Sequence, residues 1–227
     1  VKMQDGIFQP QITTFKELYN HYRNIIIGKF NPMSLAKILF KEKFGYSIEK
    51  EPINSLNRKL FNLAFFNPVD IWTTLADKLA VRKFVKSKGC ADILLTVYKY
   101  WDNVWGIDFS SLPNSFVLKC NHDNGSTILV YDKFFVDKSF IEDFYRRKLS
   151  LPFGIETAEP HYLGIKPFVF AEELLENDKQ FSSGLVSYKF FSDHGKAKFC
   201  QVIYDTECYD EQKSQIYETN GWIQCPG

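Results

Sequence analysis

A lysine interrupts an apolar run near the middle of the chain. Residues 116–130 read FVLKCNHDNGSTILV, which predicts two strands joined by a turn at Asn124-Gly125, since Gly accepts the positive φ of such turns. Strand alternation places Lys119 on the face opposite Phe116. A lysine at the centre of an apolar strand loses hydration unless it meets an anion or opens onto a cleft. This segment is therefore either an anion site or an ordinary hairpin with an edge lysine.

The loop after this lysine offers small polar side chains and backbone N–H groups, a chemistry suited to phosphate oxygens. The candidate loop residues are Asn121, His122, Asn124, Gly125 and Ser126.

A second group of cations lies upstream, in LADKLAVRKFVKSKG (residues 75–89). Thr74 and Asp77 have the spacing of a capping box and Gly89 stands at a C′ position, so the segment predicts one helix. Lys78, Arg82 and Lys86 recur at four-residue spacing along one side of it. Taken alone, such a stripe is typical of a solvated helix face.

Two adjacent carboxylates follow a short apolar run in FAEELLE, residues 170–176. Strand alternation turns Glu172 and Glu173 to opposite sides, so that one of them can face a cleft. Further on, Lys189 interrupts another apolar strand in a hairpin whose turn we expect at residues 193–195. His21 and His161 have no carboxylate near them in the sequence, and we interpret them as structural or surface residues.

The elements around these residues predict an α+β fold. Apolar spacing of three and four residues favours two helices over residues 15–44, broken at Asn31-Pro32, and a third near 57–66. A further helix is expected at 140–149. Short apolar runs bounded by turn residues predict antiparallel strands rather than βαβ units. We expect these strands at 93–98, 116–120, 127–131, 168–170, 184–191 and 198–204.

Composition narrows the classes of function. With 227 residues and 45% hydrophobic content, the chain can bury a core of one or two domains. Lys and Arg (28) nearly balance Asp and Glu (27), which argues against a nucleic-acid partner. The sequence shows no membrane-spanning run, no Cys-x-x-Cys pair and neither a Walker loop nor a Gly-x-Ser-x-Gly motif. We therefore expect a cytoplasmic protein with free thiols and no membrane span.

Four pieces in this order resemble the TupA-like branch of the ATP-grasp superfamily, a branch named for teichuronopeptide biosynthesis and found among bacterial cell-surface polysaccharide genes. They are LADKLAVRKFV (75–85), LPNSFVLKCNH (112–122), AEELL (171–175) and YKFF (188–191), and the similarity covers about residues 40–222. The resemblance implies a nucleotide held between two α+β lobes. It divides the chain into a helical region (1–74), a first lobe (75–172) and a second lobe (173–227).

The resemblance also assigns roles to residues. Lys78, Lys119 and Lys189 would contact the phosphates of ATP, and the loop 121–126 would close over them. The backbone of residues 173–175, including Glu173 and Leu175, would meet the adenine edge, with Glu172 near adenine or ribose. The reaction of the superfamily is activation of a carboxylate donor by ATP and Mg²⁺ to an acyl phosphate. An amine or similar nucleophile, here on a sugar or amino-acid acceptor, then attacks it.

Departures from the pattern leave alternatives open. The branch usually carries Gly-Ser-Gly where this chain has Asp123-Asn124-Gly125, and Asp where it has Ser187. The resemblance implies that the acidic strand that holds magnesium lies beyond Gly227, so that the second lobe would be truncated. Asp205 and Glu207 are interpreted as surface acids rather than as substitutes for it. The alternatives are a non-catalytic nucleotide-binding module and a glycosyltransferase-like protein of polysaccharide synthesis.

Overall fold

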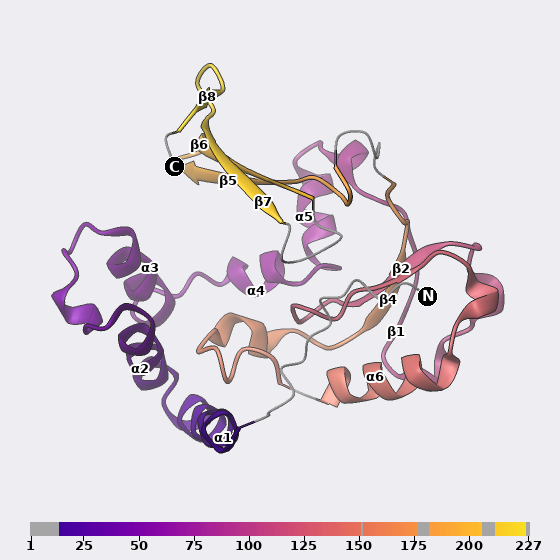
Figure 1. The fold of residues 1–227 in the computed structure, drawn as a ribbon, viewed down its shortest axis with the longest axis horizontal. Coiled ribbons are helices and arrows are strands. Elements are labelled where there is room, and N and C mark those ends of the chain that lie inside the picture. The colour runs from indigo at the N-terminus through magenta and orange to yellow at the C-terminus, as the bar shows by residue number, and fades with distance from the viewer. Residues whose placement is uncertain (1–13, 151, 177–181, 206–211, 226–227) are drawn as a thin grey trace.

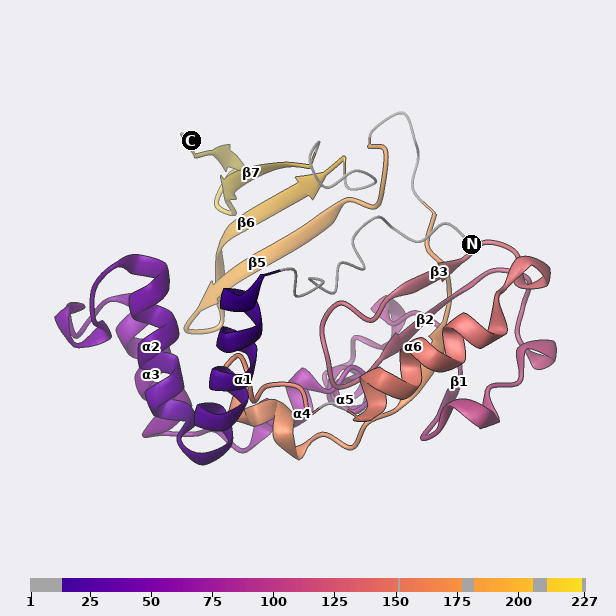
Figure 2. The same ribbon diagram turned by 60° about the horizontal axis from the view of Figure 1, so that its bottom comes forward.

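The computed structural model describes residues 14–150, 152–176, 182–205 and 212–225. It is an α+β protein with two antiparallel sheets of four strands each. Three N-terminal helices form a group at one end, the first sheet lies with helix α6 at the other, and the second sheet lies above them (Figures 1 and 2). The predicted α+β class with antiparallel strands is confirmed.

The N-terminal helices begin and end where the sequence predicts. Helix α1 (Phe15–Phe30) has a capping box built by Thr14 and Glu17, and Asn31 caps helix α2 (Pro32–Phe44) through Ser34 N. Helix α3 (Leu56–Phe65) ends before Asn67-Pro68, since a residue before Pro is pushed out of the helical region.

The single helix expected over residues 75–89 is wrong. The segment contains α4 (Ile71–Ala76) and α5 (Val81–Ser87), separated by a turn at Asp77. Asp77 leaves the helical region, with φ −74° and ψ 111°, and its Oδ1 accepts hydrogen bonds from the backbone of Leu79 and Ala80 at 2.8 and 3.2 Å. These side-chain bonds compete with helix continuation. The expected Thr74 cap is absent because Thr74 lies within α4, whereas Gly89 does adopt positive φ (+78°).

The first sheet has the order β1-β4-β2-β3. Its strands are β1 (Val97–Trp101), β2 (Phe116–Cys120), β3 (Ile128–Val130) and β4 (Val169–Glu172). The prediction of a strand at 93–98 is largely wrong, because residues 91–93 form a short 3-10 helix and pairing with β4 sets the position of β1. Helix α6 (Lys138–Ser150) packs on one face of this sheet. The buried core between them includes Phe116, Leu118, Ile128, Ile141, Phe144 and Tyr145.

The second sheet has the order β5-β6-β7-β8. Its strands are β5 (Ser187–Asp193), β6 (Lys196–Tyr204), β7 (Lys213–Glu218) and β8 (Ile223–Gln224). The expected hairpin of β5 and β6 is confirmed, with its turn at His194 and Gly195, both of positive φ. The two last strands were not predicted, since KSQIYE lacks the apolar run by which the others were recognised.

A connection between α6 and β4 joins the N-terminal helices to the first sheet. His21 Nδ1 of α1 lies 2.8 Å from Glu156 Oε2, and Thr73 Oγ1 of α4 donates to His161 O at 2.9 Å. Gly28 of α1 packs directly against the backbone of Ile155. This connection therefore holds α1 and α4 in place around residues 152–164.

Candidate functional site

Lys119 and Glu172 form an ion pair on the face of the first sheet that lies opposite α6. Their strands are neighbours: Lys119 pairs in register with Phe170, and Val117 with Glu172, so all four side chains share one face. The Lys119 side chain is 23% exposed and that of Glu172 8%. The Lys119 ammonium also lies 5.6 Å from the centre of the Phe170 ring. Lys119 is therefore half-buried, and its charge is paired with a buried carboxylate.

Lys78 lies in the turn between α4 and α5 and points toward the loop that follows β2. Its backbone N–H donates to Asn121 O at 3.1 Å, and its ammonium donates to the backbone carbonyl of Asp123. Burial lowers the pKa of the Lys78 ammonium; the charge of nearby Lys119 adds to this effect, while that of Asp123 opposes it. The two lysines that the sequence singled out therefore lie near one another at the same loop.

The loop residues divide into an inner and an outer set. Asn121 is fully buried: its amide donates to Asp77 Oδ1 (2.9 Å) and Lys166 O (3.0 Å), and its Oδ1 accepts from Phe168 N (2.7 Å). The Ser126 hydroxyl accepts from Cys120 N at 2.8 Å. His122 is also buried, at 2% exposure. Asn121 and Ser126 thus shape the loop from within, rather than offering free side chains to a ligand.

The outer set consists of Asn124 and Gly125, which are exposed at the tip of the loop. Gly125 has φ +81° and open space around its α-carbon, as the predicted turn requires. A ligand approaching the loop therefore meets this tip.

Asp123 is the residue of the loop whose placement the sequence did not indicate. It is 3% exposed; its Oδ1 accepts a 2.5 Å hydrogen bond from Ser126 Oγ, and its Oδ2 lies 3.9 Å from Lys148 Nζ of α6. Burial raises the pKa of the Asp123 carboxyl, against the lowering effects of the Ser126 hydrogen bond and the charges of His122 and Lys148. The spacing of Asp123 and Ser126 is typical of a local side-chain turn, but nothing in the sequence pairs Asp123 with Lys148.

The other predicted site residues lie farther along the chain. Glu173 Oε2 accepts from Thr96 N (3.2 Å) and Glu173 N donates to Thr96 O (2.9 Å), which fastens the end of β4 to the segment before β1. Leu175 is 45% exposed. Lys189 is exposed on β5, the edge strand of the second sheet. The structure thus brings Lys78, Lys119, Glu172 and the loop together in and beside the first sheet, with Lys189 in the other sheet.

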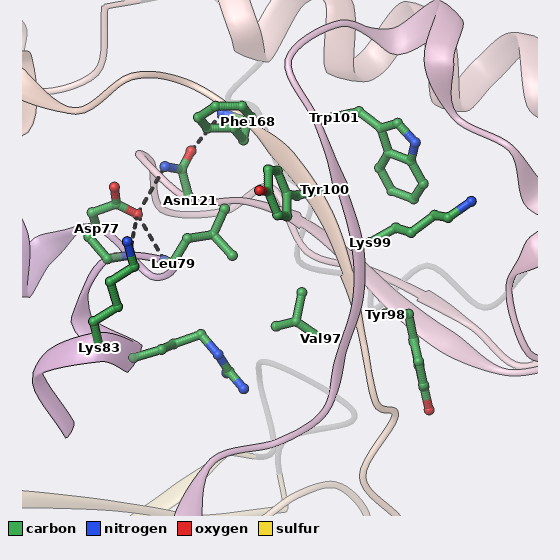
Figure 3. Close-up of a pocket in the computed structure, with 12 residues that line it drawn as sticks. Asp77, Leu79, Lys83, Val97, Tyr98, Lys99, Tyr100, Trp101, Asn121 and Phe168 are labelled. Atoms are coloured by element: carbon green, nitrogen blue, oxygen red, sulfur yellow. Dashed lines mark hydrogen bonds between the residues drawn. The ribbon is translucent and has the colours of Figure 1, made fainter. Parts of the chain in front are cut away.

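A cavity of about 770 Å³ lies between α5 and β1, beside the Asp77 turn. Its wall carries the cations Arg82 and Lys83, whereas Val97, Tyr100 and Phe168 give it apolar and aromatic surface. In Figure 3, Asp77 and Asn121 close one end of it, joined by their hydrogen bond. Because the same turn carries Lys78, the cavity and the two-lysine cluster share a boundary. Its volume lies within the range of small-molecule sites.

The described residues do not provide a magnesium site. No group of three or more His, Cys, Asp or Glu that could hold a metal ion occurs in residues 14–150, 152–176, 182–205 and 212–225. Asp205 accepts from Ser183 N and pairs with Lys213 at 2.9 Å, while Glu207 lies outside the described part of the chain. Glu172 and Asp123 each face a lysine instead.

Comparison with known families finds one that covers most of the chain. A family model described as TupA-like ATPgrasp matches residues 59–224, which is well over half of the 227 residues. The chain belongs to the TupA-like ATPgrasp family. No curated protein and no solved structure matches it.

Membership of the TupA-like ATPgrasp family implies nucleotide binding and an ATP-dependent, ligase-like function. ATP-grasp proteins generally bind ATP and Mg²⁺. The matched residues include both sheets, both lysines and the loop 121–126. Within the described residues, no helix is long and apolar enough to cross a membrane.

Proposed function

We propose that this protein binds ATP at the Lys78 and Lys119 cluster and uses it to join a carboxylate to an amine. The observation that supports this proposal is the meeting of two lysines from different elements at one loop, next to the buried carboxylate Glu172. Positioned cations stabilise the charge of a transferring phosphoryl group, and phosphoryl transfer needs little else from a protein. Within the proposal, residues 75–172 form a first nucleotide lobe, residues 173–227 belong to a second and residues 1–74 to a helical region.

The proposed reaction has two steps. A carboxylate oxygen of the donor attacks the γ-phosphorus of ATP, and the bond between that phosphorus and the bridging β-phosphate oxygen breaks. ADP departs, and the donor has become an acyl phosphate. The amine of the acceptor then attacks the acyl carbon, inorganic phosphate leaves and the amine loses a proton. Lys78 and Lys119 hold the phosphates, Glu172 meets the adenine or ribose, and the backbone of residues 173–175 contacts the adenine edge. Lys189 approaches the phosphates from the second sheet.

The cavity beside α5 supports a place for the second reactant. Arg82 and Lys83 suit an anionic group, and Tyr100 and Phe168 suit the face of a sugar or an apolar chain. A donor or acceptor bound there would lie beside the turn that carries Lys78. The resemblance to surface-polysaccharide proteins favours a sugar or amino-acid acceptor in bacterial cell-surface polysaccharide synthesis.

Calorimetric titration with ATP tests the nucleotide site. Lys78→Ala and Lys119→Ala should each weaken ATP binding about tenfold or more, because each removes a cation that meets phosphate. Lys86→Ala is the matched control, since Lys86 is exposed on α5 and lies outside the cavity lining. Equal affinities of all four proteins would refute the site.

Lys119→Ala needs a control for stability, because it leaves the buried carboxylate of Glu172 without its ion pair. Lys119→Ala combined with Glu172→Gln removes that uncompensated charge and should recover stability in thermal unfolding without recovering ATP binding. Recovery of ATP affinity in the double variant would show that the single variant failed through folding.

Acceptor-dependent release of ADP separates a ligase from a module that binds nucleotide without turnover. We expect ADP to accumulate only when both a carboxylate and an amine are supplied. Tight ATP binding without release under any pairing would favour the binding module, and preference for a nucleotide sugar over ATP would favour glycosyl transfer.

A further inference from the structure

Asp123 lies in the loop that is proposed to receive phosphate, yet its carboxylate does not face the proposed phosphate position. Both carboxylate oxygens point into the protein: Oδ1 toward the Ser126 hydroxyl at 2.5 Å and Oδ2 toward Lys148 at 3.9 Å. Since the residue is 3% exposed, solvent reaches almost none of it. A charge that would repel phosphate on the loop surface is therefore turned beneath the loop.

The groups under the loop come from helix α6. Lys148 is 14% exposed at its side chain, and its ammonium lies 5.6 Å from the Phe144 ring centre. One turn earlier, the fully buried Tyr145 donates from its hydroxyl to Ser126 O at 2.7 Å. Ser126 in turn accepts the backbone N–H of Cys120 at the end of β2. Helix α6 thus holds the loop from below at Asp123 and Ser126.

On the side of the loop away from α6, Asp123 meets Lys78, a lysine of the proposed nucleotide site. The backbone carbonyl of Asp123 accepts a hydrogen bond from the Lys78 ammonium. Lys78 is consequently directed at the loop by an atom whose position depends on the buried Asp123 side chain. A chain of contacts runs from Lys148 through Asp123 to Lys78.

We propose that Asp123 is a positioning residue, through which helix α6 fixes the loop 121–126 and the Lys78 ammonium in the arrangement that receives phosphate. The inference rests on the proposed ATP site. It explains why an acidic residue is compatible with a phosphate loop here: the carboxylate acts inward on Lys148 and Ser126, and only the backbone of Asp123 faces the nucleotide side.

The burial of this carboxylate favours a positioning role over simple filling of the core. Removing a carboxylate from water is unfavourable unless its partners compensate, and a single long contact to Lys148 compensates only in part. Asparagine in its place would accept the same hydrogen bond from Ser126 without that cost. A residue that served stability alone would therefore not need the charge.

The test compares ATP with adenosine in calorimetric titrations of the full chain. Asp123→Ala should weaken ATP and ADP binding about tenfold, because the loop and Lys78 lose their support, yet change adenosine binding by less than about twofold. Asp123→Asn keeps the acceptor for Ser126 and should fall between Asp123→Ala and the wild type. Lys148→Met should resemble Asp123→Asn. Asp132→Ala is the matched control, since Asp132 also caps a short turn but lies outside the loop.

Three outcomes decide the matter. Unchanged ATP affinity in Asp123→Ala, with wild-type binding intact, would overturn the inference and leave the proposed function standing. Equal losses for ATP and adenosine in both Asp123→Ala and Asp123→Asn would also overturn it, because they indicate general damage to the fold. Absence of ATP binding in the wild type would instead refute the proposed function, on which the inference rests.

Discussion

Three lysines surround the loop 121–126, and each already meets an oxygen of the protein. Lys78 donates to the carbonyl of Asp123, Lys119 pairs with Glu172 and Lys148 faces the Asp123 carboxylate. If phosphate binds as proposed, it meets Lys78 and Lys119 in directions that are already set, so that less side-chain freedom is lost on binding. The phosphate would also compete with the protein oxygens that now accept from these lysines, so we expect the proposed site to favour strongly charged ligands.

Stability should depend on pH through Asp123. Burial raises its folded-state pKa above the ordinary value of about 3.9, so the unfolded chain releases this proton first as pH rises. The folded state favours the protonated Asp123 carboxyl. Its contribution to the free energy of unfolding is therefore complete at pH values below the ordinary pKa, and it is lost as the pH rises through the folded-state pKa. Asp123→Asn should thus gain stability relative to wild type in urea unfolding as the pH rises from about 4, the ordinary pKa of the group, through the raised folded-state pKa.

The comparison between these two proteins isolates Asp123 from the other charged groups that face it, which are Lys148, Lys78 and His122. A stability difference that stays constant over this pH range would contradict the raised pKa.

At the residue scale, the sequence identified Lys119 because a charge in an apolar strand is unusual, and Lys78 only through its resemblance to a known motif. It could not identify Lys148, which follows Tyr145 by three residues on a helix face that reads as ordinary amphipathic surface. The inward direction of Asp123 depends on that distant lysine and was therefore not predictable from its neighbours.

At the scale of the elements, the turn between α4 and α5 depends on contacts across the chain. Asp77 accepts from the Asn121 amide, 44 residues away, as well as from its own neighbours. The periodicity of residues 75–89 contains no sign of that partner, so a continuous helix was the natural prediction. By contrast, β2 has the predicted ends, because its apolar run and the loop after it are both local signals.

Helix α1 gives a prediction of unusual sign. Replacing glycine by alanine inside a helix normally stabilises it by about 0.5–1 kcal/mol. At Gly28, however, a β-carbon would lie 2.1 Å from the backbone oxygen of Ile155, so Gly28→Ala should destabilise the protein by about 1–3 kcal/mol. Chemical denaturation measures this, with exposed Lys29→Ala as the control on the same helix. A stabilised Gly28→Ala variant would show that α1 does not pack on residue 155.

For the molecule as a whole, the two sheets differ in how much of their surface is buried. Every residue of β4 is buried, as are four of the five residues of β2, whereas all seven residues of β5 are exposed. Aromatic side chains on the second sheet remain open to solvent, including Tyr188, Phe190 and Phe191. Lys78 and Lys119, the two lysines proposed to hold the nucleotide, thus belong to the better-buried half of the fold.

Hydrogen exchange should report this difference. We expect amides of β2 and β4 to exchange most slowly and those of β5 and β6 faster, since local opening costs less where few apolar contacts are broken. Mass spectrometry of peptides from each strand measures it. Equal protection in both sheets would indicate that the second sheet is covered in solution.

The connection that holds α1 and α4 bears on how small a nucleotide-binding piece of this protein can be. The family match begins at residue 59, but Gly28 and His21 contact residues 155 and 156 within the matched span. Thr157 also lines a hollow between α2 and α3. Cutting the chain at the family boundary would strip these contacts from a segment that leads directly into β4. The shortest useful expression fragment therefore starts before α1.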